Sequence, residues 1–246
     1  MSRGPLEAVV FDAGGTLARL DFEWMSGWVT AHGLPLEAGA LRRAEVEGRR
    51  AYDASFGFGD GHGAGAANPP LGSRGDVRAY FGGMLEAAGV AEPLRTRAFD
   101  AFAERQRGEG LWVRPVEGAR ATLDRLRALG LRMACVSNSD GRAEWHLEHT
   151  GTRAGLEFVV DSQIVGIEKP DPRIFAIALE RLGVAAERAL YVGDIRSVDE
   201  AGARAAGMHF VLIDPFGDYA PPGGDSIRAI GDLADWIAPR FSRPVR

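Results

Sequence analysis

The chain has 246 residues, of which 46% are hydrophobic and 26% are charged, proportions typical of a globular protein with one large core or a core and a smaller module. Its net charge of −5 at pH 7 argues against nucleic acid and anionic membranes as partners, because both bind basic surfaces. No apolar run approaches the roughly 20 residues of a membrane-spanning helix, and the single cysteine, Cys135, excludes an internal disulfide.

The first predicted element is a short buried strand at residues 8–11. The run is wholly apolar and leads into Asp12 and a pair of glycines, which is typical of a strand that ends in a loop. Residues 19–112 differ, because they have few β-branched runs and several segments with helical periodicity. These segments are 37–52, 76–88 and 95–107, and a glycine-rich stretch at 56–75 interrupts them. We therefore expect a helical insert after the first strand.

The remaining sequence alternates between apolar runs and amphipathic segments. Further strands are predicted at 131–136, 189–192 and 210–213. Helices are predicted at 116–129, 172–182 and, last in the chain, 226–237. Asp171 and Pro172 are an N-cap and a first-turn proline for the second of these helices. The alternation indicates an α/β fold with a doubly wound parallel sheet that helices cover on both faces.

Polar side chains follow three of the predicted strands. Asp12 follows the first strand, Ser137 follows the second, and Asp194 lies two residues beyond the third. Because the carboxyl ends of parallel strands meet at one edge of a sheet, where such sheets bind ligands, we expect these side chains to form one site. A carboxylate in this position can attack a phosphoryl group and form an aspartyl-phosphate, and Asp12 is the predicted nucleophile.

Lys169 is the only lysine among the 29 basic residues of the chain. Arginine carries a planar fork of donors, whereas lysine carries a compact ammonium that acts as a point charge. A lone lysine in an arginine-rich chain therefore indicates a site too narrow for a guanidinium. Phosphoryl transfer mainly requires positioning and positive charge, so we expect Lys169 to neutralise both Asp12 and a bound phosphate. The Ser137 hydroxyl and backbone N–H groups near Asn138 and Gly14 are the other predicted phosphate donors.

Four pieces of sequence then require a joint explanation. They are FDAGGTL at 11–17, VSN at 136–138, KPDP at 169–172 and VGD at 192–194, with Asp199 five residues after Asp194. Their order and spacing resemble the haloacid dehalogenase-like (HAD) hydrolase superfamily. The resemblance implies a Rossmann-like HAD core domain formed by residues 1–18 and 113–246. It also implies that residues 19–112 are a helical cap domain of the first type.

For the site, the resemblance implies a Mg²⁺ ion held by Asp12, by the backbone carbonyl of Gly14 and by Asp194. Mg²⁺ is a hard ion that prefers carboxylates, carbonyls and water, and it keeps substrate phosphate as a ligand. Asp199 is expected to orient Lys169 or to hydrogen-bond a group that holds the metal. These residues together predict a Mg²⁺-dependent phosphatase of a small phosphorylated metabolite.

Gly14 departs from the pattern of most HAD phosphatases, which carry a second aspartate at this position as general acid and base. Its carbonyl can still hold a metal, but the proton-transfer group is lost, and such a group is typically worth about 10²–10⁴ in rate. We expect a slow phosphatase, or one selective for leaving groups that need little protonation, such as acyl or aryl phosphates. Asp21 and Glu23 are the nearest acids that offer a substitute.

Two alternatives remain beside the phosphatase. A 2-haloacid dehalogenase also lacks the second aspartate and needs no metal, but its fourth motif lacks the Gly193-Asp194 pair that this chain has. A catalytically degenerate binding protein is the other alternative, although retention of Asp12, Lys169 and Asp194 argues against it. A phosphonatase is excluded, because its mechanism needs a cap lysine and the chain has no second lysine.

The predicted partners follow from charge and motifs. We expect a small phosphorylated substrate, no nucleic acid and no membrane, and a protein that is a monomer or a homodimer. The first six residues carry no apolar signal segment, which together with the single cysteine predicts a cytoplasmic location.

Overall fold

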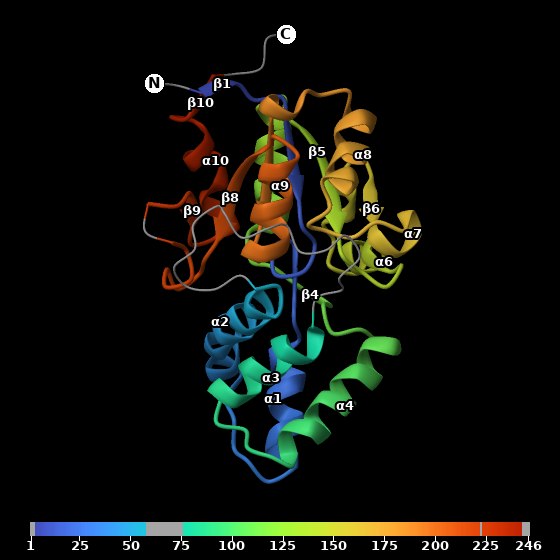
Figure 1. Cartoon of the computed structure of the whole chain (residues 1–246), viewed down its shortest axis with the longest axis vertical. Coiled ribbons are helices and arrows are strands. Elements are labelled where there is room, and N and C mark those ends of the chain that lie inside the picture. Colours follow the sequence, from blue (N-terminus) through green and yellow to red (C-terminus); the bar gives the residue numbers. More distant parts are fainter. Residues whose placement is uncertain (1–2, 58–75, 222, 243–246) are drawn as a thin grey trace. The chain divides into compact units, whose positions relative to one another are not determined.

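The computed structural model describes residues 3–57, 76–221 and 223–242, which fall into two compact units (Figure 1). The first unit comprises Met1–Arg19 and Val113–Arg246, and the second comprises Leu20–Trp112. Most of the glycine-rich stretch predicted at 56–75 lies outside the described residues. No helix in the described part of the chain is both long and apolar enough to cross a membrane.

The first unit is built on a six-stranded parallel sheet, which confirms the predicted α/β fold with a doubly wound parallel sheet. The strand order is β6-β5-β2-β7-β8-β9. The strands are β2 (Ala8–Phe11), β5 (Arg132–Ser137), β6 (Val159–Asp161), β7 (Ala189–Gly193), β8 (His209–Ile213) and β9 (Ser226–Ile227). Two short pairs lie outside it: β1 (Arg3–Pro5) with β10 (Phe241–Ser242), and β3 (Ala18–Arg19) with β4 (Arg114–Pro115).

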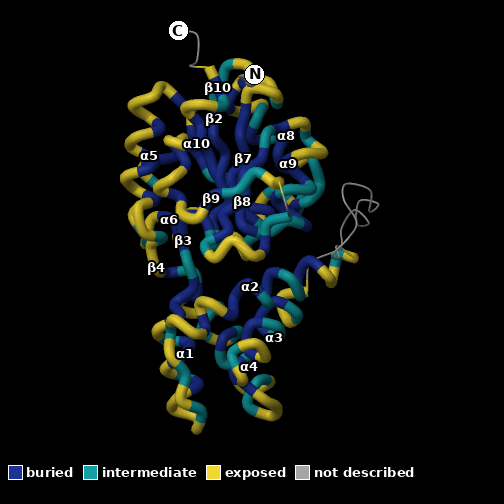
Figure 2. The backbone as a smooth tube through the Cα atoms, turned by 90° about the vertical axis from the view of Figure 1, so that its left-hand side faces the viewer, coloured by how far each residue is buried: buried dark blue, intermediate teal, exposed yellow. Residues whose placement is uncertain are grey.

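Helices cover both faces of this sheet. They are α5 (Ala119–Ala128), α6 (Ala143–His149), α7 (Ser162–Val165), α8 (Pro172–Leu182), α9 (Ala201–Ala205) and α10 (Leu233–Ile237), with short turns η1 (Arg153–Gly155), η2 (Ala186–Arg188), η3 (Arg196–Glu200) and η4 (Ile230–Asp232). Figure 2 shows β2 and β7 buried between α5 and α10 on one side and α8 and α9 on the other. Because alternate residues of a strand face opposite ways, Phe11 and Val192 join the cluster under α5, whereas Tyr191 contacts Phe175 of α8.

The start of α8 follows the sequence signals closely. The Asp171 side chain accepts a hydrogen bond from the backbone N–H of Arg173, and Pro172 occupies the first turn. The proline needs no donor there, and the carboxylate satisfies a backbone N–H group that would otherwise be unpaired. The predicted cap is therefore confirmed, and it fixes the chain directly after Lys169.

The predicted helix at 226–237 is wrong over its first half. Residues Ser226 and Ile227 instead form β9, where they pair with the end of β8. The Asp232 carboxylate accepts from the N–H of Ala229, and α10 begins only at Leu233. A free edge of a parallel sheet offers backbone partners, and these outweigh the helical periodicity of the segment.

In the described residues, the second unit consists of helices α1 (Phe22–Ala31), α2 (Ala38–Ser55), α3 (Val77–Ala87) and α4 (Leu94–Arg107). Helices α2 and α3 approach closely at Gly48, where a Cβ atom would lie 2.6 Å from the backbone carbonyl oxygen of Tyr80. The ring of Phe102 is fully buried and contacts the rings of Trp24 and Phe81. Aromatic packing therefore provides much of the interior of this unit.

Asp214 organises the loop that follows β8. Its buried carboxylate accepts hydrogen bonds from the backbone N–H groups of Gly217 at 2.8 Å, Tyr219 at 3.1 Å and Ala220 at 3.0 Å. Burial alone would raise the pKa of this carboxyl, but the three donors hold the pKa below its usual 3.8. The ionised form of Asp214 is therefore part of the folded loop.

We predict that Asp214→Asn lowers the free energy of unfolding at neutral pH by about 1–3 kcal/mol, because an amide leaves buried N–H groups poorly paired. The pKa of Asp214 is lower in the folded state, so its contribution is present above the unfolded-state pKa and is lost as the pH falls through the folded-state pKa. Urea unfolding should show the gap from wild type closing as the pH is lowered. Asp235→Asn, which removes an exposed partner of Arg125, is the control and should change little.

Candidate active site

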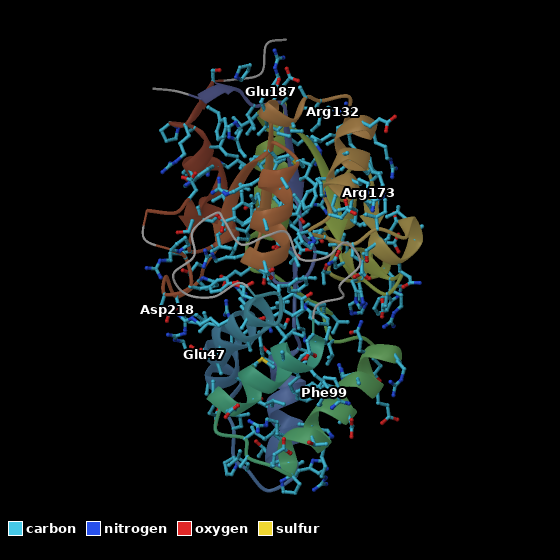
Figure 3. All side chains as sticks on the ribbon, viewed as in Figure 1. Glu47, Phe99, Arg132, Arg173, Glu187 and Asp218 are labelled. Atoms are coloured by element: carbon cyan, nitrogen blue, oxygen red, sulfur yellow. The ribbon has the colours of Figure 1, made fainter. Side chains whose placement is uncertain are left out.

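The register of the sheet brings the predicted site residues to one edge. Phe11 of β2 pairs with Cys135 of β5 and with Val192 of β7, so the residues that follow these three strands leave the sheet side by side. Figure 3 labels residues at both edges of the first unit. Arg132 and Glu187, where strands begin, lie at one edge, and Asp218, in the loop after β8, lies at the other.

Lys169 is the centre of a buried group of polar side chains. Its Nζ donates to Asp12 Oδ1 at 2.6 Å, to Asp199 Oδ1 at 2.7 Å and to the Tyr191 hydroxyl at 3.0 Å. The residue is only 3% exposed. Burial alone would lower the pKa of Lys169, but the two carboxylates raise it above its usual value of 10.5. Lys169 is therefore a fixed positive charge whose three N–H groups all have partners.

Asp12 lies directly after β2 and is 7% exposed. The pKa of its carboxyl is raised from 3.8 to about 6. Burial is the main cause and the charge of Asp199 adds to it, whereas Lys169 acts in the opposite direction. A second positive charge beside Asp12 would favour the ionised carboxylate, which is the form that attacks as a nucleophile.

Asp199 uses both carboxylate oxygens within the site. Oδ1 accepts from Lys169, and Oδ2 accepts from the backbone N–H groups of Asp194 at 3.1 Å and Ile195 at 3.0 Å. Asp199 lies in η3, a π-helical turn, and π turns are frequent at functional sites. The carboxylate thus joins the ammonium to the chain that carries Asp194.

Three carboxylates meet where a divalent cation would fit. Asp12, Asp194 and Asp199 each offer an oxygen, and these atoms lie within 4.8 Å of one another. Hard oxygen donors suit Mg²⁺. Gly15, with φ of 74°, leaves room for one of them, since a Cβ atom there would lie 2.0 Å from Asp194 Oδ2. The donor set is therefore compatible with a Mg²⁺ ion.

The predicted phosphate-binding residues lie at the ends of β2 and β5. Ser137 is buried as the last residue of β5, and Gly14 is half-buried two residues after Asp12. The Asn138 side chain forms two hydrogen bonds with the backbone of Lys169: Nδ2 donates to its carbonyl at 3.0 Å, and Oδ1 accepts from its N–H at 2.8 Å. Asn138 therefore also fixes the segment that carries the lysine.

The predicted substitute acids, Asp21 and Glu23, lie at the start of the second unit. Asp21 is the N-cap of α1, where Oδ1 accepts from the N–H of Trp24 and Oδ2 accepts from Arg105 at 3.0 Å. Glu23 is exposed on α1. The role of these two acids as substitutes for the side chain that Gly14 lacks stays a prediction.

Sequence reasoning missed Tyr191, the third partner of Lys169. Tyr191 lies within a strand whose other residues are apolar or glycine. Because its ring is apolar, the residue fits the apolar run and its hydroxyl was overlooked. The available signal was a polar group in the middle of a fully buried strand, because such a group requires a partner.

Comparison with known proteins agrees with this geometry. The family model for haloacid dehalogenase-like hydrolases matches residues 6–207. The chain belongs to the haloacid dehalogenase-like hydrolases. This confirms the resemblance on which the site residues were chosen.

Individual relatives are similar to this HAD hydrolase over most of its length. It is 36% identical over 214 residues to haloacid dehalogenase-like hydrolase domain-containing protein 3 of Bos taurus, a match that covers 85% of this chain and 82% of that protein. It is 29% identical over 235 residues to the N-acetylmuramic acid 6-phosphate phosphatase of Pseudomonas aeruginosa, with 92% of each covered. A crystal structure of a HAD phosphatase from Thermococcus onnurineus superposes with a TM-score of 0.57 at 23% identity, covering 95% of this chain and 98% of that one. At that identity the likeness concerns the fold alone.

Proposed function

We propose that this HAD hydrolase is a Mg²⁺-dependent phosphatase that hydrolyses a small phosphorylated metabolite through an aspartyl-phosphate on Asp12. The observation that carries the proposal is the buried contact of 2.6 Å between Asp12 and the ammonium of Lys169, beside the carboxylates of Asp194 and Asp199. A relative that is named as a sugar phosphate phosphatase supports it.

The chemistry divides between the chain and the metal. Mg²⁺ held by Asp12, the Gly14 carbonyl and Asp194 would neutralise negative charge on the phosphate. A carboxylate oxygen of Asp12 bonds to phosphorus, the bond from phosphorus to the leaving oxygen breaks, and that oxygen keeps the electron pair. Water then attacks phosphorus, the bond to Asp12 breaks, and inorganic phosphate leaves. The Ser137 hydroxyl and nearby backbone N–H groups donate to the phosphate oxygens during both steps.

Gly14 sets the substrate preference of this site. Without a carboxyl group at that position, the leaving oxygen must take its proton from water, and water in the second step must lose its proton without that carboxylate. Leaving groups that are stable as anions are therefore favoured, which selects acyl and aryl phosphates over alkyl phosphates. In this proposal, residues 19–112 act as the cap that selects the rest of the substrate, in a cytoplasmic monomer or homodimer.

The proposal is tested by phosphate release from an activated aryl phosphate and from a panel of phosphorylated metabolites. We expect turnover with Mg²⁺ and none with EDTA. Chloride release from a 2-chloroacid without Mg²⁺ would favour the dehalogenase instead, because dehalogenases also lack the second aspartate. Binding of beryllofluoride with no turnover of any phosphate ester would favour a degenerate binding protein.

We predict that Gly15→Ala weakens Mg²⁺ binding about 10- to 100-fold, the usual effect of disturbing the groups that support metal ligands. The added Cβ atom would lie 2.0 Å from Asp194 Oδ2 and must displace that carboxylate. Gly33→Ala is the matched control, because Gly33 also has positive φ but has no atom within 4 Å of the new Cβ position. Titration calorimetry with Mg²⁺ measures both variants. Equal affinity in Gly15→Ala and wild type would remove Asp194 from the proposed metal site.

A further inference from the structure

Tyr191 places a hydroxyl group in the apolar interior of the sheet. The residue is fully buried in the middle of β7, and its ring packs against Phe175 of α8 with ring centroids 4.9 Å apart. A phenylalanine would fill the same space without a polar atom. A buried hydroxyl destabilises a fold unless it is hydrogen-bonded, so its partners indicate what it contributes.

Those partners join two parts of the proposed site. The hydroxyl accepts from Lys169 Nζ at 3.0 Å, and it lies 2.9 Å from the backbone carbonyl oxygen of Val136 and 3.2 Å from Asp199 Oδ1. It has a single proton, and the Val136 carbonyl and the Asp199 carboxylate are the two acceptors within reach of it. Val136 directly precedes Ser137, so the hydroxyl connects the end of β5 with the lysine.

The ammonium itself has three N–H groups, and three acceptors surround it. Asp12 and Asp199 take two of them, and Tyr191 takes the third. If the Tyr191 hydroxyl were removed, one N–H of a buried cation would face the edge of an aromatic ring. The ammonium would then turn or shift to find another acceptor, and its contact with Asp12 would change.

We propose that Tyr191 is a positioning residue, which accepts the third N–H of Lys169 and thereby aims the ammonium at Asp12. It does not touch the reacting atoms. It acts through Lys169, which balances the charge of Asp12 while that carboxylate gains and loses the phosphoryl group. The kinetic consequence rests on the proposed phosphatase function, whereas the effect on the ammonium does not.

The sequence supplies a direct probe of this contact, because Lys169 is the only lysine in the chain. Protein labelled with ¹⁵N-lysine should give one Nζ signal. In the wild type we expect an ammonium signal that exchanges slowly with water, and in Tyr191→Phe a signal with a changed shift and faster exchange. Tyr80→Phe is the matched control, since it removes a buried hydroxyl that donates to Glu45 at 2.7 Å in the helical unit. The Lys169 Nζ signal of Tyr80→Phe should match that of the wild type.

Kinetics provide the second readout. With an aryl phosphate as substrate, we expect kcat of Tyr191→Phe to fall about tenfold, the size expected for one hydrogen bond to a charged group, while KM stays within about twofold. A purely structural role would lower the yield and stability of the protein and leave kcat per folded molecule unchanged.

The proposal is overturned if Lys169 Nζ in Tyr191→Phe keeps the wild-type chemical shift and exchange rate and kcat is unchanged. If that variant does not fold, the unmodified protein decides, because the proposal requires a nuclear Overhauser effect between the Lys169 ammonium protons and the ring protons beside the Tyr191 hydroxyl. Absence of that effect overturns the proposal as well. A wild-type protein that hydrolyses no phosphate ester refutes the proposed function alone, since both NMR measurements are made without substrate.

Discussion

Asp12→Asn should remove essentially all phosphatase activity, with a fall in kcat on the order of 10⁴ or more, as expected when a nucleophile is lost. A neutral amide does not attack phosphorus to give an acyl phosphate, so the first step is blocked. The substitution also removes one of the two carboxylates that contact Lys169. Loss of a partner from a buried ion pair is destabilising, so the folded fraction must be measured by circular dichroism alongside the rate.

Asp171→Asn is the matched control for that experiment. It makes the same chemical change two residues from Lys169, at a helix N-cap where asparagine serves about as well as aspartate. Its kcat should stay close to that of the wild type. Activity of Asp12→Asn above about a hundredth of the wild-type rate, with the variant folded, would mean that another group is the nucleophile.

Gly14→Asp should raise kcat for alkyl phosphates by about 10²–10⁴, the usual contribution of a general acid and base. The backbone at Gly14 does not have positive φ, so an aspartate there meets no left-handed strain. Aryl phosphates should gain far less in the first step, because their leaving groups need little protonation. The rate ratio between alkyl and aryl substrates is therefore the quantity to measure.

Gly14→Asn separates proton transfer from shape. The asparagine side chain has the size of aspartate but transfers no proton at neutral pH, so its alkyl-to-aryl ratio should match that of the wild type. Equal gains in both Gly14 variants, or equal gains for both substrate classes in Gly14→Asp, would contradict the view that position 14 lacks only a proton-transfer group.

The sequence allowed the sheet and its edge to be predicted because buried parallel strands are continuous apolar runs. Asp12 and Asp194 follow two such runs, and the register of β2 with β7 then places them at the same edge. The segment at 226–227 was misassigned for a related reason. A two-residue strand at the sheet edge is stabilised by its neighbour β8 and leaves almost no periodic signal of its own.

The partners of each side chain were harder to predict, because they depend on contacts between distant segments. The motifs indicated that Lys169 and Asp12 belong to one site, but nothing in them indicated that the Asn138 side chain binds the lysine backbone. Tyr191 was hidden because its ring satisfies the apolar pattern of β7 and only its hydroxyl carries the function that we propose. Such details require the three-dimensional arrangement of β5, β7 and the Lys169 segment.

The most direct measurement is the location of the phosphoryl group during turnover. The protein is mixed with Mg²⁺ and an aryl phosphate, quenched in acid within the steady state and digested, and the peptide that contains Asp12 is examined by mass spectrometry. We predict one phosphoryl group on Asp12, labile to hydroxylamine as an acyl phosphate must be, and missing from Asp12→Asn. A phosphoryl group on any other residue, or steady turnover by folded Asp12→Asn, would contradict the account.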